Sequence, residues 1–392
     1  MDLSYSPEYE AFRREVVHFL ETHKAEAPGV GRGDGRAWQK LLIERGYAAR
    51  SIPQVYGGHG AAPDILRSRI IAEEFARAQI SQGLGGQGIS MLVPTLLEVG
   101  TEDQRRRFIG PTLRGEMSWC QGYSEPGAGS DLANLRTRAE LDGDHWVING
   151  QKIWTSSAHF ADWIFCLVRT EPDAPKHQGI SFLLFDMKTP GIEVRPLVDM
   201  TGAANFNEVF FTDVRVPAHQ IVGKRGEGWQ VANSILRHER GSLADPNVML
   251  SRLGALTDLM KSETIDGRPV IDDPIYRDRL MRIQGRVLAM RCNDLRLLSA
   301  AVNHQEPGLA AVVVKLQGTE LRHELEGLAI DVMGEPGLLY GETPHLRNGG
   351  SWQWNYMFFL GLIIGGGTSQ IQKNIISERG LGMPREPKPA KA

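Results

Sequence analysis

Apolar residues follow a helical spacing through roughly the first hundred residues of the chain, where one face of each segment is apolar. The segments are 12–20, 37–46, 64–79 and the stretch that starts at 101. Ser6 and Pro7 suit the N-cap and first position of the first helix, and Gly46 suits the C-cap of the second. Thr101 and Gln104 match a capping box at the start of a later helix. The N-terminal part is therefore predicted to be helical.

From about Trp119 the apolar residues alternate with polar ones, which predicts strands. Strand candidates lie at 137–156, 161–170, 179–187, 191–197 and 207–217. The Asp-Gly pair at 142–143 and the Asn-Gly pair at 149–150 are typical of two-residue hairpin turns, so we expect a turn at each. Residues 119–222 are therefore predicted to form an antiparallel barrel or sandwich.

Helical spacing returns near residue 226 and continues over longer segments. These segments are 229–244, 273–303 and 308–334. In the second, the apolar residues Leu280, Ile283, Val287 and Met290 step by three and four, as in the seam of a helical bundle. Helices, then strands, then helices predict an α+β fold rather than a doubly wound nucleotide-binding fold. The expected domains are 1–118 (helical), 119–225 (antiparallel β) and 226–392 (helical bundle).

Composition excludes several classes of function. A net charge of −3 gives no basic surface for nucleic acid or anionic lipid. The longest apolar run, 357–364, is too short to cross a bilayer, and the polar N-terminus is not a secretory signal. Cys120, Cys166 and Cys292 show no metal-ligand spacing and suit a reducing compartment. We expect a cytoplasmic protein without a metal site or a membrane span.

Two glycine-rich segments are candidates for ligand binding. Residues 83–88 read Gly-Leu-Gly-Gly-Gln-Gly and satisfy the dinucleotide-binding pattern, but a helical segment precedes them where that motif needs a strand. A loop between helices is the better interpretation. The second segment, Gly365 to Gly367, leads through Thr368 into a helical run, so its backbone N–H groups can approach a ligand closely.

Three motifs, in order along the chain, resemble the acyl-CoA dehydrogenase family. They are Ser-Glu-Pro-Gly-Ala-Gly-Ser-Asp at 124–131, Asn-Gly-x-Lys-x-Trp at 149–154, and the segment 367–385 that begins Gly-Thr-Ser-Gln. The resemblance spans essentially the whole chain and implies the helical–β–helical plan read independently from the patterns. It also implies an FAD-dependent enzyme that introduces an α,β-double bond into an acyl-CoA thioester. Such enzymes pass electrons to an electron-transfer flavoprotein and work as dimers or tetramers, so this oxidoreductase is expected in lipid metabolism of the β-oxidation type.

The resemblance also assigns residues to the cofactor and the substrate. The residues implied for FAD are Gln121, Tyr123, Ser124, Gly129, Ser130, Trp154, Thr155, Ser156, Gly367, Thr368 and Gln370. Those implied for the substrate are Ser130, Arg240 and Gly366. Taken alone, Trp154 would be read as a core aromatic of the β domain and Thr368 as a plain helix N-cap. Arg240 would be read as one half of an ordinary salt bridge on a helix.

The catalytic base is not where many family members carry it. Those members have a Glu just before the Gly-Thr of the last loop, and here that position is Gly366. In a smaller group the base belongs to a Glu-Arg pair on a helix, and Glu239 occupies that position here. The competing interpretation is that Glu239 is a solvated or paired helix carboxylate. Glu378 is expected to form an ion pair at a helix end.

Two further positions depart from the family pattern. Glu263 stands where an Arg reaches the FAD pyrophosphate of a neighbouring subunit, and Asp331 stands where a Gln contacts the cofactor. Arg268 could remake the first contact. These departures leave three functions open: an active dehydrogenase, as a homo-oligomer or a heterotetramer with a related subunit; a non-catalytic subunit; and a relative with altered chemistry, such as a CoA-thioester desulfinase. The acyl group also stays open among straight, branched and sterol-side-chain thioesters.

Overall fold

The computed structural model describes residues 5–29, 34–242, 245–306 and 308–385, with the backbone alone for 238–242. It divides into two compact units, 1–239 and 240–392, and each is considered by itself. The first unit contains helices followed by a β sheet and most of one further helix, and the second is helical. The predicted order of helices, strands and helices is thereby confirmed. The domain boundaries expected at 118/119 and 225/226 stay predictions.

The first unit has helices in each segment where the pattern predicted them, and further short helices between these segments. The helices are α1 (Pro7–His23), α2 (Gly35–Arg45), α3 (Ile65–Ala78), α4 (Val93–Val99), α5 (Glu102–Gln104), α6 (Gly110–Leu113) and α7 (Gly228–Ser242). Gly46 ends α2 in the left-handed conformation at a φ of 74°, and both hydrogen bonds of the capping box between Thr101 and Gln104 are present. Residues 83–88 connect α3 to a π-helical turn at Gly88–Leu92, so the expected loop between helices is confirmed.

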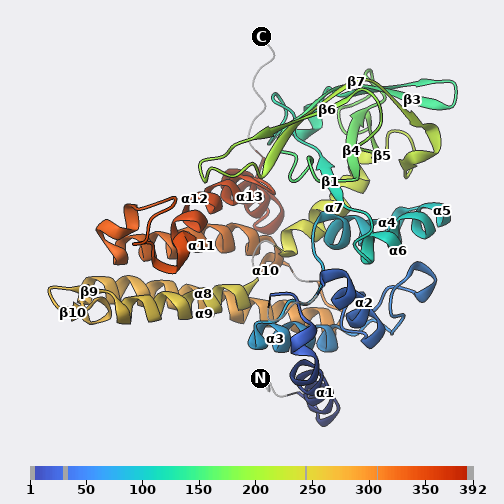
Figure 1. Ribbon diagram of the computed structural model, residues 1–392. Coiled ribbons are helices and arrows are strands. Elements are labelled where there is room, and N and C mark those ends of the chain that lie inside the picture. The colour runs from blue at the N-terminus through green and yellow to red at the C-terminus, as the bar shows by residue number, and fades with distance from the viewer. Residues whose placement is uncertain (1–4, 30–33, 243–244, 307, 386–392) are drawn as a thin grey trace. The chain divides into compact units, whose positions relative to one another are not determined.

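One sheet of eight strands forms the middle of the chain (Figure 1). Its strands are β1 (Trp119–Gly122), β2 (Arg138–Asp142), β3 (His145–Lys152), β4 (Trp163–Arg169), β5 (Ile180–Asp186), β6 (Ile192–Leu197), β7 (Phe206–Pro217) and β8 (Ile221–Val222). The strand order is β6-β7-β3-β2-β4-β5-β8, and β1 pairs with β4. The pairs are antiparallel except β1 with β4 and β2 with β4, which run parallel.

One of the two predicted turns is a turn and the other is not. Asp142 pairs with His145, so the chain reverses between β2 and β3 through Gly143, which has a φ of 61°. The turn expected at Asn149-Gly150 is wrong: both residues lie inside β3, where the pairing with β7 shifts register between Ile148 and Gly150. Glycine is needed at this bulge because its φ is 147° and a Cβ atom would lie 2.7 Å from the Cα atom of Thr137.

The strands β4 and β5 are buried on both faces. On one face Phe165, Leu167, Phe182 and Leu184 join a core that also contains residues of α4, α6 and α7. On the other face Ile164, Cys166, Val168, Leu183 and Phe185 join the core enclosed by the sheet itself. Each of these two strands therefore carries a continuous apolar run, 164–168 in β4 and 182–185 in β5, whereas β3 and β7 alternate between buried and more accessible positions.

The second unit is a bundle of helices. Its elements are α8 (Pro246–Ser262), β9 (Thr264–Ile265), β10 (Arg268–Pro269), α9 (Pro274–Val302), α10 (Leu309–Val312), α11 (Val314–Met333), α12 (Ser351–Ile364) and α13 (Ser369–Ile375). In Figure 1, α8 and α9 run side by side, and the β9–β10 hairpin lies at one end of the pair, where the chain passes from α8 to α9. The predicted seam on α9 is confirmed, because Leu280, Ile283, Val287 and Met290 are all buried in one core. Among the described residues, none of the helices combines the length and apolar character that a membrane span requires.

Candidate functional site

The two motifs expected to bind the flavin lie next to each other in the first unit. The first motif follows β1 and the second covers the end of β3. The Ile153 amide donates to the Ser124 carbonyl at 2.9 Å, and this bond joins the two segments. Gln121 and Ser124 are half-buried, Tyr123 is buried, and Gly129 and Ser130 are exposed. The structure thus brings the predicted residues at 121–130 and 154–156 together.

A buried ion pair holds these segments in place. The Lys152 ammonium is fully buried and lies 2.8 Å from a carboxylate oxygen of Glu125, which is itself buried. Lys152 also donates to the Tyr123 carbonyl at 3.1 Å. Glu125 accepts two further hydrogen bonds from the backbone amides of Arg136 and Thr137, at 2.6 and 2.9 Å. The carboxylate therefore fixes both ends of the loop between β1 and β2.

The surroundings of Glu125 keep it ionised. Burial by itself would raise the pKa of this carboxyl group, but the Lys152 charge and the hydrogen bonds outweigh it, and the pKa is lowered. For the nearby Cys166 thiol burial is the larger effect, and it raises the pKa of the thiol to about 12 although the Lys152 charge acts in the opposite direction. An ionised Glu125 is an anchor for the loop rather than a proton acceptor, because its lone pairs are already engaged.

Trp154 is held in an unusual and exposed position. Its φ is 59°, in the left-handed region that bulky residues rarely adopt, and 60% of its surface is accessible. The core-aromatic interpretation of Trp154 is therefore wrong for this structure. Asn207 fixes the neighbouring backbone: the Asn207 carbonyl accepts from the Thr155 amide at 3.0 Å, and its side-chain amide donates to the Thr155 carbonyl at 2.8 Å. A strained, exposed aromatic on a rigid support is typical of a ligand contact.

The side chain of Thr155 lacks a hydrogen-bond partner in the described part of the chain. It is fully buried, and its hydroxyl oxygen has no hydrogen-bond partner among the residues that the structure describes. Leaving a buried hydroxyl unpaired costs about 1–3 kcal/mol, so such groups generally have a partner in the functional state. Gly127 and Gly129 leave open space where a side chain would begin. An orphaned hydroxyl, an exposed indole and an open glycine loop fit a flavin.

In the second unit the glycine loop connects α12 to α13. Gly366 and Gly367 both have positive φ values, 64° and 97°, which L side chains rarely adopt. The Thr368 hydroxyl accepts from the Ile371 amide at 3.2 Å, so Thr368 is the N-cap of α13, as one interpretation expected. A cap and a ligand contact do not exclude each other, because both use the free groups at a helix start. The Gln370 side chain is exposed.

The proposed base lies on α7, but its side chain lies outside the described residues. The backbone of Glu239 and Arg240 is helical, and nothing is described of the two side chains. Their roles as base and substrate contact stay predictions. Glu378 forms the expected ion pair, in which its carboxylate lies 3.2 Å from Arg385.

The two carboxylates that depart from the family pattern, Glu263 and Asp331, are each neutralised by an arginine within the second unit. Glu263, at the end of α8, lies 2.5 Å from the Arg347 guanidinium. Asp331, on α11, lies 2.5 Å from the Arg279 guanidinium. Arg268, on β10, is exposed. Both carboxylates are therefore engaged in ion pairs.

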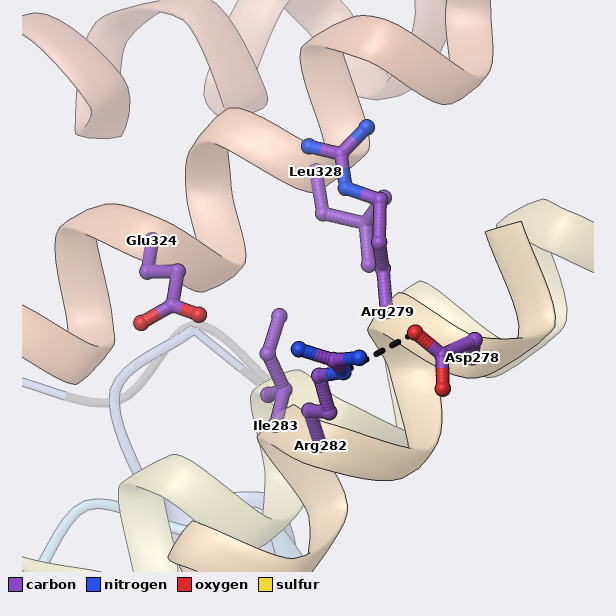
Figure 2. A pocket seen from close by; sticks show the side chains of 6 residues that line it. All are labelled: Asp278, Arg279, Arg282, Ile283, Glu324 and Leu328. Carbon is purple, nitrogen blue, oxygen red and sulfur yellow. Dashed lines mark ion pairs between the residues drawn. The ribbon is translucent and has the colours of Figure 1, made fainter. Parts of the chain in front are cut away.

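A cleft of about 340 Å³ opens beside the second of these ion pairs, between α9 and α11. It is lined by Asp278, Arg279, Arg282, Ile283, Glu324 and Leu328. Figure 2 shows the Arg282 side chain turned toward Asp278, at a distance of 2.9 Å. Glu324 is likewise paired with Arg286, one turn further along α9. Because these arginines already have carboxylate partners, the cleft offers little to an anion.

Sequence reasoning missed three residues that support the site. Glu125 and Lys152 lie inside the quoted motifs, but no role was predicted for either. Opposite charges in two motifs that were expected to bind one cofactor were the available signal. Asn207 gave no signal, because its contact with Thr155 spans about fifty residues and depends on the pairing of β3 with β7.

Comparisons with known proteins agree with this arrangement. Three family models match the chain: the N-terminal domain of acyl-CoA dehydrogenase at 6–116, its middle domain at 120–214 and its C-terminal domain at 226–381. The acyl-CoA dehydrogenase IpdE1 of Mycobacterium tuberculosis (strain ATCC 25618 / H37Rv) is 42% identical over 356 residues, which cover 90% of this chain and 89% of that protein. The chain belongs to the acyl-CoA dehydrogenase family.

Solved acyl-CoA dehydrogenase structures share the fold over nearly the whole length. The Tcur3481-Tcur3483 steroid ACAD matches with a TM-score of 0.81 and 30% identity, covering 98% of this chain and 100% of that one. The ChsE4-ChsE5 complex from Mycobacterium tuberculosis matches with a TM-score of 0.80 and 32% identity, with the same coverage. The predicted fold and the predicted family are therefore both confirmed.

Proposed function

We propose that this chain is an FAD-dependent dehydrogenase of acyl-CoA thioesters. The observation that carries the proposal is the buried Thr155 hydroxyl without a partner in the described chain, next to the exposed Trp154. In this proposal Trp154, Thr155 and Ser156 hold the flavin, together with the predicted residues at 121–130 and at 367–370. FAD supplies the acceptor for the hydride that leaves the β-carbon of the acyl group. The predicted boundaries of the three domains and the cytoplasmic location belong to the same proposal.

The chain's own residues handle the proton in this reaction. Glu239 takes the proton from the α-carbon, and the electron pair of that C–H bond becomes the new double bond as the β-hydrogen leaves as hydride. While the α-proton leaves, negative charge develops transiently on the thioester oxygen, and backbone N–H groups of the Gly366 loop offset it. Gly366 can serve this role without a side chain, because only its amide is required. Arg240 contacts the substrate beside the base.

Replacing Glu239 with Gln tests the base directly. Glu239→Gln keeps the size of the side chain and removes its basicity, so turnover should fall by about 10²-fold or more. Flavin absorbance should persist, because Glu239 is not among the flavin contacts. Arg237→Gln, on an exposed position of the same helix, serves as the matched control. Near-normal turnover in E239Q would exclude Glu239 as the base.

The substrate class and the electron acceptor can be tested with the same enzyme. We propose a sterol-derived acyl-CoA, because a structural relative that covers 98% of this chain is a steroid ACAD. A panel of straight, branched and steroid thioesters scored by flavin bleaching tests this choice. An electron-transfer flavoprotein should then reoxidise the reduced flavin faster than oxygen does. Preference for a straight-chain thioester would contradict the substrate assignment.

A second candidate is a subunit that completes a related chain. The ion pairs of Glu263 with Arg347 and of Asp331 with Arg279 favour it, because both carboxylates stand where the family contacts a neighbour's cofactor. A structural relative is the two-chain ChsE4-ChsE5 complex, which fits a heterotetramer. Co-expression with a related chain, followed by flavin counting per chain, separates the candidates. One FAD in each subunit of a homomer would exclude the heteromer.

A further inference from the structure

A row of buried polar side chains on α11 faces α12 and the glycine loop. Glu326 is fully buried and accepts hydrogen bonds from Arg252 and Arg322. The two guanidiniums lie over aromatic rings of α12, Arg252 over Trp352 at 3.9 Å and Arg322 over Phe359 at 4.5 Å. Contacts of this kind fix one helix relative to the other. The position of α12 is therefore set by α8, which carries Arg252, and by α11, which carries Arg322, before the chain reaches the glycines.

Lys315 extends this row to the loop itself. Its side chain is 2% exposed, and its ammonium donates to the carbonyl of Ile363 at 2.9 Å and to that of Gly367 at 2.7 Å. The first carbonyl belongs to the last turn of α12, where a positive charge also offsets the helix dipole. The second belongs to the loop. One side chain thus joins the end of α12 to the peptide that precedes Thr368.

A second donor fixes the adjacent peptide. The Gln372 side-chain amide lies 3.2 Å from the Gly366 carbonyl, and Gln372 is buried. In a trans peptide the C=O and the following N–H point in opposite directions. Because the carbonyls of Gly366 and Gly367 are turned toward Gln372 and Lys315, the N–H groups of Gly367 and Thr368 are turned away from these donors. Neither N–H group donates to an atom in the described part of the chain.

We propose that Lys315 is a positioning residue that aims the Gly367 and Thr368 amides at an electronegative oxygen of the bound cofactor or substrate. Two neighbouring backbone amides without a partner in the described chain can together act as donors to such an oxygen. The proposed function supplies only the identity of the oxygen, on the flavin or on the thioester. The orientation of the two peptides is inferred from their hydrogen bonds to Lys315 and Gln372 and does not depend on the proposed function.

The test compares Lys315→Met with Lys315→Arg, in the presence of the sister subunit if the enzyme needs one. K315M keeps the length of the side chain and removes both hydrogen bonds, so FAD binding should weaken about tenfold or more, which corresponds to one lost charge-assisted hydrogen bond. The carbonyl stretch of a bound enoyl-CoA, measured by infrared difference spectroscopy, should move toward its value in solution. K315R should restore part of both signals. Lys373→Met, an exposed lysine on α13, is the matched control and should change neither.

Other results separate positioning from stability. If K315M does not fold, Gln372→Met removes the neighbouring donor instead, and it should weaken FAD binding and shift the carbonyl stretch in the same direction but less. Unchanged FAD affinity and carbonyl stretch in a folded K315M would overturn the inference. So would a crystal structure of K315M with the Gly367 carbonyl in its present orientation, whether or not FAD binds. A wild-type protein that binds neither FAD nor acyl-CoA would instead refute the proposed function.

Discussion

Breaking the buried ion pair of Glu125 and Lys152 should unfold the loop between β1 and β2, which carries the first motif. In Lys152→Met the carboxylate stays buried and keeps the two amide donors of Arg136 and Thr137, but it loses the ammonium group with which it forms an ion pair. Removing one member of a buried ion pair costs about 3–5 kcal/mol. For a unit of 239 residues this lowers Tm by roughly 6–20 °C, and FAD retention should fall with it.

The pH dependence of the loss tests the cause. The lowered pKa of Glu125 means that the ionised carboxylate stabilises the fold above its unfolded pKa, and that this contribution is lost as pH falls through the folded pKa. In K152M burial is no longer offset by the ammonium, so the pKa of Glu125 rises and less stability is lost in acid. The difference in Tm between wild type and K152M should therefore be largest near neutral pH and shrink as pH falls toward about 4.

Differential scanning calorimetry from pH 7 down to about 4 measures both effects. The double variant Glu125→Gln with Lys152→Met should be less destabilised than K152M, because no charge stays buried without a partner. Lys188→Met, at an exposed position after β5, is the matched control. A Tm of K152M within about 2 °C of wild type would refute the reasoning, since the predicted loss is several times larger. A pH-independent difference would refute the electrostatic cause.

Two further predictions concern buried groups of the first unit, the Thr155 hydroxyl and the thiols of Cys120 and Cys166. Thr155→Val removes an unpaired hydroxyl, so the flavin-free protein should be unchanged or about 1 kcal/mol more stable while FAD affinity falls about tenfold; a stability loss with normal FAD affinity would contradict the proposed contact. Burial raises the pKa of Cys120 far above that of a free thiol and the pKa of Cys166 to about 12, whereas Cys292 is exposed. Iodoacetamide at pH 8 should therefore modify Cys292 alone in the folded protein, and mass spectrometry of a second labelled cysteine would disprove this protection.

Local patterns located most elements because each carried its own signal. The caps at Gly46 and Thr101, the seam on α9 and the turn at Gly143 depend on residues within one or two turns of the chain. The turn expected at Asn149-Gly150 failed because Thr137, from the neighbouring strand, determines what that glycine must avoid. A contact between strands leaves no mark in the spacing of a single segment.

The residues of the candidate site show the same difference between local signals and contacts with distant elements. The motifs marked Trp154, Thr155 and Thr368, since each belongs to a short run of characteristic residues. They did not mark Asn207 or Lys315, which hold these runs from distant elements through one or two hydrogen bonds. Supporting residues of this kind are fixed by tertiary geometry, and a single sequence does not reveal which lysine or asparagine it will use.

Because β4 and β5 face apolar surroundings on both sides, the usual alternation of polar and apolar residues cannot set their alignment. A slip by one residue would exchange the two faces, yet the positions from Ile164 to Val168 and from Phe182 to Phe185 would stay apolar. Along β4 the two faces differ in bulk, because Phe165 lies on one side and Cys166 on the other, whereas on β5 each side holds a phenylalanine, Phe182 or Phe185. A shifted pairing of β4 with β5 would be disfavoured by poor steric fit rather than by exposure of apolar residues to water. A larger side chain at Cys166 should therefore disturb the correct strand pairing more than a polar residue at the end of either strand.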